Sequence, residues 1–123
     1  MKSCKVAFLL LPVIYGLLFT SCNKENETDY TYFLIEVDSI QIPNYISTSE
    51  SFDFILFGII GTNGCQQFHE LKIEQKGNEI FIEAWGKSAV NANACPAVMV
   101  YLENERLNYS IHEKGTYTIN IKT

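Results

Sequence analysis

The segment FHELKIEQKGNEIFIEAW, from Phe68 to Trp85, carries the clearest fold signal in the chain. Polar and apolar residues alternate on both sides of Lys76-Gly77-Asn78, and Gly and Asn accept the positive φ angles that tight turns need. The pattern predicts a β-hairpin, with these residues on its buried face: Leu71, Ile73, Ile80, Ile82 and Ala84. Phe81 and Trp85 then share the opposite face. They are candidates for stacking on a sugar ring or a protein surface, or for covering a neighbouring strand.

The alternation continues in both directions from this hairpin. Short runs rich in β-branched and aromatic residues are separated by turn residues, and no stripe with helical period occurs. Besides the hairpin, strands are expected in TYFLIEVDSIQIP, SFDFILFGII, AVMVYLE, RLNYSI and TYTINIKT. About seven strands in a chain this short predict an all-β fold, an antiparallel two-sheet sandwich.

Two of these segments carry finer predictions. In TYFLIEVDSIQIP the apolar residues Phe33, Ile35 and Val37 share one face, but Ile40 and Ile42 continue it only if the phase slips near Asp38-Ser39. That slip predicts a β-bulge or bend. SFDFILFGII is apolar on both faces, so a central strand covered on both sides is expected.

The N-terminus has the pattern of a signal peptide. Two lysines precede the uncharged run VAFLLLPVIYGLLF, which ends in the small residues before Cys22. The run is shorter than the roughly 20 residues that a membrane-spanning helix needs. LLFTSCNKENE resembles the lipobox of bacterial lipoproteins, whose signal peptidase cuts before a cysteine that is then acylated. This resemblance implies a leader over residues 1–21, lipidation of Cys22, a tether over residues 22–30 and one domain over residues 31–123.

Further motifs bear on where the protein is and how it is modified. The acidic run NKENETD resembles the export signal that sends lipoproteins of the Bacteroidota to the cell surface. It implies anchoring at the outer membrane or cell surface, with the periplasmic face as the alternative. Asp38-Ser39-Ile40 fits the three-residue pattern that the same bacteria use for O-glycosylation. Ser39 is therefore a candidate glycosylation site.

The charge balance excludes one class of partner. Lys2 and Lys5 are the charged residues of the leader, so the mature chain has 9 − 2 = 7 basic and 14 acidic residues, a net charge of −7. Such a surface repels nucleic acid, and nucleic-acid binding is not expected.

Cys65 follows the turn sequence Gly-Thr-Asn-Gly and has several conceivable uses. With Cys4 in the leader and Cys22 acylated, Cys65 and Cys95 form an even pair outside the cytoplasm, which favours a disulfide. Closing such a loop contributes about 3 to 4 kcal/mol in the chain-entropy model. The weaker alternatives are a phosphate cradle, a redox thiol, and a zinc site with His69 and His112. No metal or cofactor is expected.

The end of the chain carries a second resemblance. HEKGTYTINI resembles the closing strand of immunoglobulin-like and fibronectin-type-III-like modules, in which a tyrosine hydroxyl bonds back to the turn. The resemblance implies that role for Tyr117. More broadly, the order of VDSIQIP, GTNGCQQF, the hairpin and GTYTI resembles small lipoproteins of the Bacteroidota. That resemblance implies a fold and a location but no activity.

The functional expectation is a non-catalytic module that binds a protein or glycan, or supports a larger assembly, with no catalytic residues. Phe81, Trp85 and Tyr101 are the candidate binding residues. One alternative is a protease-inhibitor-like module in which the loop 86–96, pinned by Cys95, inserts into the protease. A small hydrolase or a zinc protein is the least favoured reading.

Overall fold

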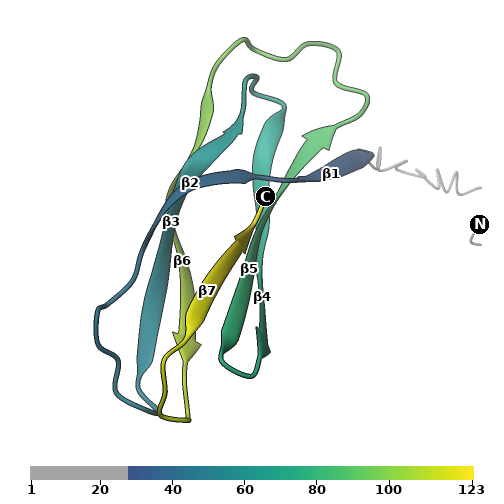
Figure 1. Ribbon diagram of the computed structural model, residues 1–123. Helices are drawn as coiled ribbons and strands as arrows, with labels where there is room; N and C mark the ends of the chain where they lie inside the picture. Colours follow the sequence, from purple (N-terminus) through teal and green to yellow (C-terminus); the bar gives the residue numbers. More distant parts are fainter. Residues whose placement is uncertain (1–27) are drawn as a thin grey trace, which may run out of the picture.

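The computed structural model describes residues 28–123, which form seven β-strands in two packed sheets (Figure 1). The predicted leader and Cys22 lie outside these residues. The strands are β1 (Tyr30–Leu34), β2 (Glu36–Gln41), β3 (Ser51–Gly61), β4 (Gln66–Lys76), β5 (Glu79–Ala89), β6 (Val100–Ser110) and β7 (Thr118–Lys122). Within the described part of the chain, no helix is long and apolar enough to cross a membrane.

The two sheets are built around β3 and β5. In the β5 sheet, β4 pairs with one edge of β5, and β1 and β7 share the other edge. In the β3 sheet, β2 and β6 flank β3. The predicted antiparallel two-sheet sandwich with one disulfide is confirmed. A single pairing, that of β5 with β7, is parallel.

The core lies between these sheets and follows the alternation in the sequence. Every second residue of β3 from Phe52 to Ile60, and of β5 from Ile80 to Gly86, is buried. The buried apolar residues are Ile35, Phe52, Phe54, Leu56, Ile60, Ile80, Ile82, Ala84, Leu102 and Ile111. Burial of each large side chain stabilises the fold by about 1.5 to 3 kcal/mol relative to exposure, before entropy is subtracted.

The hairpin predicted around Gly77 is present. Gly77 has a φ of 59°, in the left-handed region that favours glycine, and a two-residue turn joins β4 to β5. Ile80 and Ile82 are fully buried, whereas Leu71 and Ile73 on β4 are half-buried and pack against the core.

The segment 30–42 forms two strands that belong to different sheets. β1 pairs with β5 and β2 pairs with β3, and the chain crosses between the sheets at Ile35. The Ile35 side chain is 1% exposed, and its N–H donates to the Ala84 carbonyl at 2.8 Å. The predicted bulge is confirmed by a shift of the β2–β3 register between Val37 and Ser39. Ile42, expected to point inward, is exposed because it lies beyond the end of β2.

Three other expectations are corrected. β3 is central in its sheet, but none of the strands in the described part of the chain covers its outer face, and Ile59 there is 39% exposed. The end of AVMVYLE, from Val100, and RLNYS to Ser110 form one strand, β6, which continues through a bulge near Asn104 (φ 55°). β5 runs on to Ala89 because β1 pairs with its end, so the long loop covers residues 90–99 instead of 86–96.

Candidate functional site

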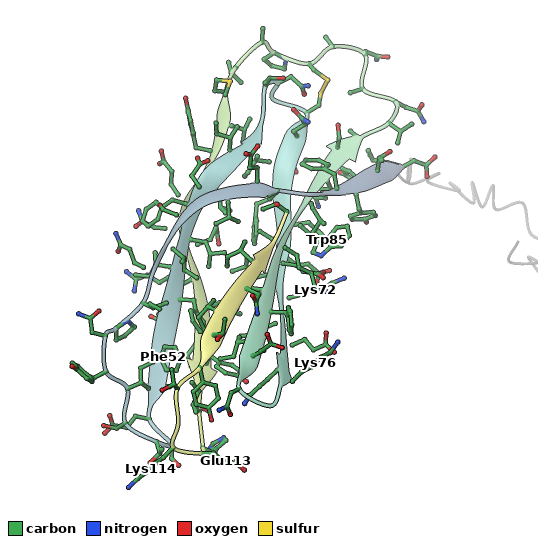
Figure 2. The ribbon with its side chains drawn as sticks, in the orientation of Figure 1. Phe52, Lys72, Lys76, Trp85, Glu113 and Lys114 are labelled. Carbon is green, nitrogen blue, oxygen red and sulfur yellow. A yellow bond between two sulfur atoms is a disulfide. The ribbon has the colours of Figure 1, made fainter. Side chains whose placement is uncertain are left out.

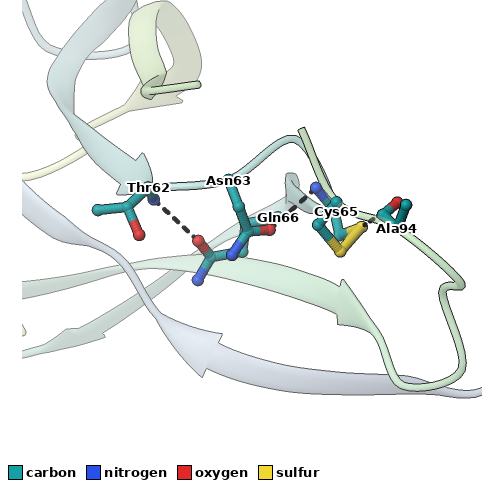
Figure 3. The surroundings of a disulfide bond; sticks show 6 residues. Thr62, Asn63, Cys65, Gln66 and Ala94 are labelled. Carbon is teal, nitrogen blue, oxygen red and sulfur yellow. Dashed lines mark hydrogen bonds between the residues drawn. A yellow bond between two sulfur atoms is a disulfide. The ribbon is translucent and has the colours of Figure 1, made fainter. Parts of the chain in front are cut away.

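The Cys65–Cys95 disulfide fixes one end of the sandwich (Figure 3). The two Cα atoms are 5.2 Å apart, and the bond joins the β3–β4 turn to the loop 90–99. The Asn63 side-chain oxygen accepts the N–H of Cys65 at 3.0 Å, and the Gly64 N–H donates to the Pro96 carbonyl at 2.8 Å. The Gly-Thr-Asn-Gly turn therefore serves to present Cys65 to the loop.

The disulfide also argues against the zinc site that was considered for Cys65 and Cys95 with the two histidines. Both sulfurs are bonded to each other, so neither is available as a thiolate ligand. The two histidines lie at opposite ends of the sandwich. His69 stacks near Tyr32 with ring centroids 4.8 Å apart, and His112 is exposed just after β6. Within residues 28–123 no group of three or more metal-binding side chains comes together.

A hollow lies at the end of the sandwich opposite the disulfide. This distal pocket is bounded by the loop 42–50 after β2 and by the segment 111–117 before β7. Figure 1 shows these two segments at the same end of the sandwich. Its volume is about 460 Å³, within the range typical of small-molecule sites. Its apolar lining consists of Ile42, Pro43, Tyr45, Ile46, Phe52, Phe54, Ile111, Tyr117 and Ile119.

The floor of the distal pocket is part of the core. Phe52 and Phe54 are buried, and their rings meet edge to face with centroids 5.0 Å apart. Tyr117 forms one wall, and its hydroxyl donates to the Glu113 carbonyl at 2.9 Å. The bond that the closing-strand resemblance implied for Tyr117 is thus present. It fixes the turn that borders the pocket.

The rim of the pocket is exposed and chemically mixed. Tyr45 is 95% exposed, the largest exposed fraction among the large apolar side chains, and Ile46 beside it is also exposed. Glu113 and Lys114 add one charge of each sign, and Figure 2 shows them at the same end of the molecule as Phe52. A backbone bond of 2.8 Å from the Ser49 N–H to the Ile111 carbonyl ties the two bordering segments together. The arrangement suits an apolar or aromatic group that carries polar substituents.

Phe81 and Trp85 lie on the outer face of the β5 sheet, as predicted. Lysines cover their rings. The Lys72 ammonium is 5.1 Å from the Trp85 ring centroid (Figure 2), and the Lys122 ammonium is 5.6 Å from the Phe81 ring centroid. The Trp85 indole N–H donates to Glu83 at 2.8 Å. A shallow hollow of about 340 Å³ accompanies Phe81. A ligand that stacks here has to displace cation–π contacts first.

Tyr101 belongs to a different surface. It lies on β6 opposite Ile59, on the outer face of the β3 sheet. The structure therefore brings Phe81 and Trp85 together but separates them from Tyr101. Ser39, the candidate glycosylation site, is exposed at the bulge of β2.

Sequence reasoning missed the distal pocket. Its walls come from segments more than sixty residues apart, which only the fold brings together. One signal was present: the connection after β2 carries Ile42, Tyr45 and Ile46, which are unusually apolar residues for an exposed loop.

Comparisons with protein-family models, curated proteins and solved structures find no match for this chain.

Proposed function

We propose that the protein is a lipid-anchored, non-catalytic binding module of the bacterial envelope, of the Bacteroidota type, with its ligand site in the distal pocket. Acylation at Cys22 would hold it to the outer membrane or cell surface, and a protein or glycan would place an apolar face in the pocket. The observation that carries the proposal is the aromatic-floored pocket of about 460 Å³ at the end of the sandwich away from the N-terminal tether.

The course of the chain supports this orientation. β1 begins at Tyr30 beside Ala89, and the Asp29 carbonyl accepts the N–H of Val90, so the tether enters at the disulfide end. β3 runs from the pocket to that end over 11 residues, a length of about 35 Å. An anchor at Cys22 therefore leaves the pocket facing away from the membrane. The disulfide itself fits an oxidising compartment.

The inhibitor alternative has weaker support. The loop 90–99 is exposed and pinned by Cys95, as an inserting loop has to be. However, it lies at the tether end, where a membrane anchor would restrict the approach of a protease. No second function is proposed.

The test is a binding screen that compares three sites. Acylated protein in detergent is screened against a glycan array and a peptide library, and each hit is measured again with Tyr45→Ala. Loss of a fully engaged aromatic contact is expected to weaken binding about tenfold or more. Tyr101→Ala is the matched control, since it removes an exposed tyrosine from the other end of the molecule.

The same hits separate the rival sites. A hit that weakens with Trp85→Ala and not with Tyr45→Ala would move the ligand site to the β5 sheet. A protease ligand that is lost when the loop 90–99 is shortened would favour the inhibitor function. Either pattern contradicts a ligand site in the distal pocket.

A further inference from the structure

Large apolar side chains stay exposed around the point where the tether enters the sandwich. They are Tyr30, Ile59, Val90, Val98, Met99 and Tyr101, called here the tether-end patch, and their exposed fractions run from 37% to 56%. They come from the loop 90–99 and from the adjoining ends of β1, β3 and β6, which Figure 1 shows at the same end of the molecule. Isolated exposed apolar residues are ordinary, but a group of six at one end marks an interaction surface.

This end of the molecule is also nearly free of charge. No Asp, Glu, Lys or Arg occurs from residue 54 to residue 68, or from residue 88 to residue 102. The charged residues that adjoin the patch by sequence or pairing are Asp29, Glu36 and Glu103. The Lys87 ammonium also lies over the Tyr30 ring, 4.7 Å from its centroid. The distal end is different, because Glu50, Lys76, Glu79, Glu113 and Lys114 all lie there. The two ends therefore prefer different surroundings.

The patch is held in one arrangement by covalent and hydrogen bonds. The disulfide fixes Cys95, and the N–H groups of Gly64 and Val98 both donate to the Pro96 carbonyl, at 2.8 and 3.0 Å. The Val90 N–H donates to Asp29 at 2.9 Å. A surface organised in this way loses little conformational entropy when it binds.

We propose that the tether-end patch rests on the lipid bilayer, so that the domain contacts the membrane directly as well as through its acyl chains. This inference rests on the proposed acylation at Cys22. From Cys22 to Tyr30 there are 30 − 22 = 8 residues, which reach at most about 28 Å even when fully extended. So short a tether keeps the patch at a high effective concentration near lipid.

The chemistry of the patch fits the membrane interface. Tyr30 and Tyr101 combine an apolar ring with a polar tip, the property that enriches tyrosine at the level of the lipid headgroups. Val98 and Met99 supply apolar contact without charge. Because the mature chain carries a net charge of −7, zwitterionic lipid is the expected surface. A protein partner or a second copy of the chain is the competing occupant.

The test measures contact between single positions and lipid. The acylated protein, purified from membranes in a Trp85→Phe background, is reconstituted into vesicles of phosphatidylethanolamine and phosphatidylcholine. The phosphatidylcholine is brominated along its acyl chains, because bromine quenches tryptophan only at contact. The tryptophan of Met99→Trp is expected to lose about half its emission, as for residues a few ångströms into the interface. The tryptophan of Tyr45→Trp, at the distal end, should be unaffected, and Val98→Trp is a second reporter.

Flotation of the vesicles separates the two proposals. If the protein does not float with the vesicles, the proposed anchoring fails and the contact fails with it. If the protein floats but neither Met99→Trp nor Val98→Trp is quenched, the proposed membrane contact is wrong, although the proposed anchoring is supported. A protein partner would then be the expected ligand of the patch. Equal quenching of Tyr45→Trp would also overturn the proposed orientation.

Discussion

Glu83 is the polar centre of the outer face of β5. It accepts hydrogen bonds of 2.8 Å from the Lys122 ammonium and from the Trp85 indole. The bond from Lys122 is the main cause that lowers the pKa of the Glu83 carboxyl, and the bond from Trp85 adds to it. Reciprocally, Glu83 raises the pKa of Lys122. One half-buried side chain thus connects β7 to the centre of its sheet.

This pairing predicts a pH dependence of stability. Because the pKa of Glu83 is lower in the folded state than its ordinary value of 4.5, its contribution is present above that value and is lost as the pH falls through the folded pKa. Glu83→Gln should therefore destabilise the protein at neutral pH and have little effect near the acid limit. Urea unfolding at a series of pH values measures this. Glu103→Gln is the control, because Glu103 is exposed and forms no ion pair among residues 28–123. If the loss of stability depended on pH equally in both variants, the prediction would be contradicted.

Asn120 carries a cost to stability. It lies beside Phe81 on β7, and its buried side-chain nitrogen has no hydrogen-bond partner within residues 28–123. Such an unsatisfied group costs about 1 to 3 kcal/mol, and a β-branched residue suits a strand. Asn120→Val should therefore raise the free energy of unfolding by about 1 kcal/mol. A denaturant midpoint that is unchanged or lower would contradict this reading of the site.

At the scale of single residues, the sequence predicted those interactions that depend on residue counts or on short motifs. The disulfide followed from compartment and an even cysteine count, and the Tyr117 bond followed from a motif spanning a few residues. The sequence could not show that Tyr101 and Trp85 lie on different sheets, since alternation shows which residues share a face of one strand but not which sheet that strand joins. The lysines over the two aromatic rings were also missed. They come from β4 and β7, and only strand pairing brings them there.

At the scale of elements, the pairing of β2 with β3 depends on Gly58. A Cβ atom at this position would overlap the carbonyl oxygen of Glu36 and approach the Val37 Cα to 3.1 Å. Both are backbone atoms, so they cannot rotate away. Gly58→Ala should destabilise the protein by about 1 to 3 kcal/mol by forcing the strands apart.

Gly115→Ala is the matched control for this substitution. A Cβ atom there would have its nearest neighbour at 3.5 Å, an ordinary contact, and the residue has no positive φ. Chemical denaturation of both variants tests the difference. Equal stability of Gly58→Ala and Gly115→Ala would show that β2 can shift at no cost.

The expected number of strands was right, although two of the expected boundaries were wrong. The sequence of segment 30–42 predicts one strand with a bulge, because no turn residues occur around Ile35. In the structure the segment forms two strands that belong to two sheets. The polar run after Leu102 reads as a turn, but β6 continues through it because those side chains face solvent. Periodicity reports extended backbone and exposure, whereas strand pairing depends on distant partners.

At the scale of the whole molecule, the sandwich has two unlike ends. The tether end carries few charges, bears the exposed apolar patch and is closed by the disulfide. The distal end is charged at its rim and opens into the pocket. An elongated domain with this polarity suits a module that is held at one end and binds at the other.

The disulfide should supply much of the stability of so small a domain. The cysteines are 30 residues apart, and the chain-entropy model gives about 3 to 4 kcal/mol for a loop of that length. Cys65→Ala/Cys95→Ala should therefore lower the free energy of unfolding by about that amount. Thermal and urea unfolding of the double variant measure it. A loss well under 1 kcal/mol would mean that the loop 90–99 stays ordered without the bond.

The central claim is a disulfide-stapled module anchored through Cys22, and the intact mass of the protein extracted from its native membrane fraction tests it most directly. The mass is measured after alkylation, with and without prior reduction. The expected chain begins at an acylated Cys22 and takes up alkyl groups at Cys65 and Cys95 only after reduction. A chain that keeps its leader, or whose Cys22 is alkylated as a free thiol, would contradict the anchor. Alkylation of Cys65 and Cys95 without reduction would contradict the staple.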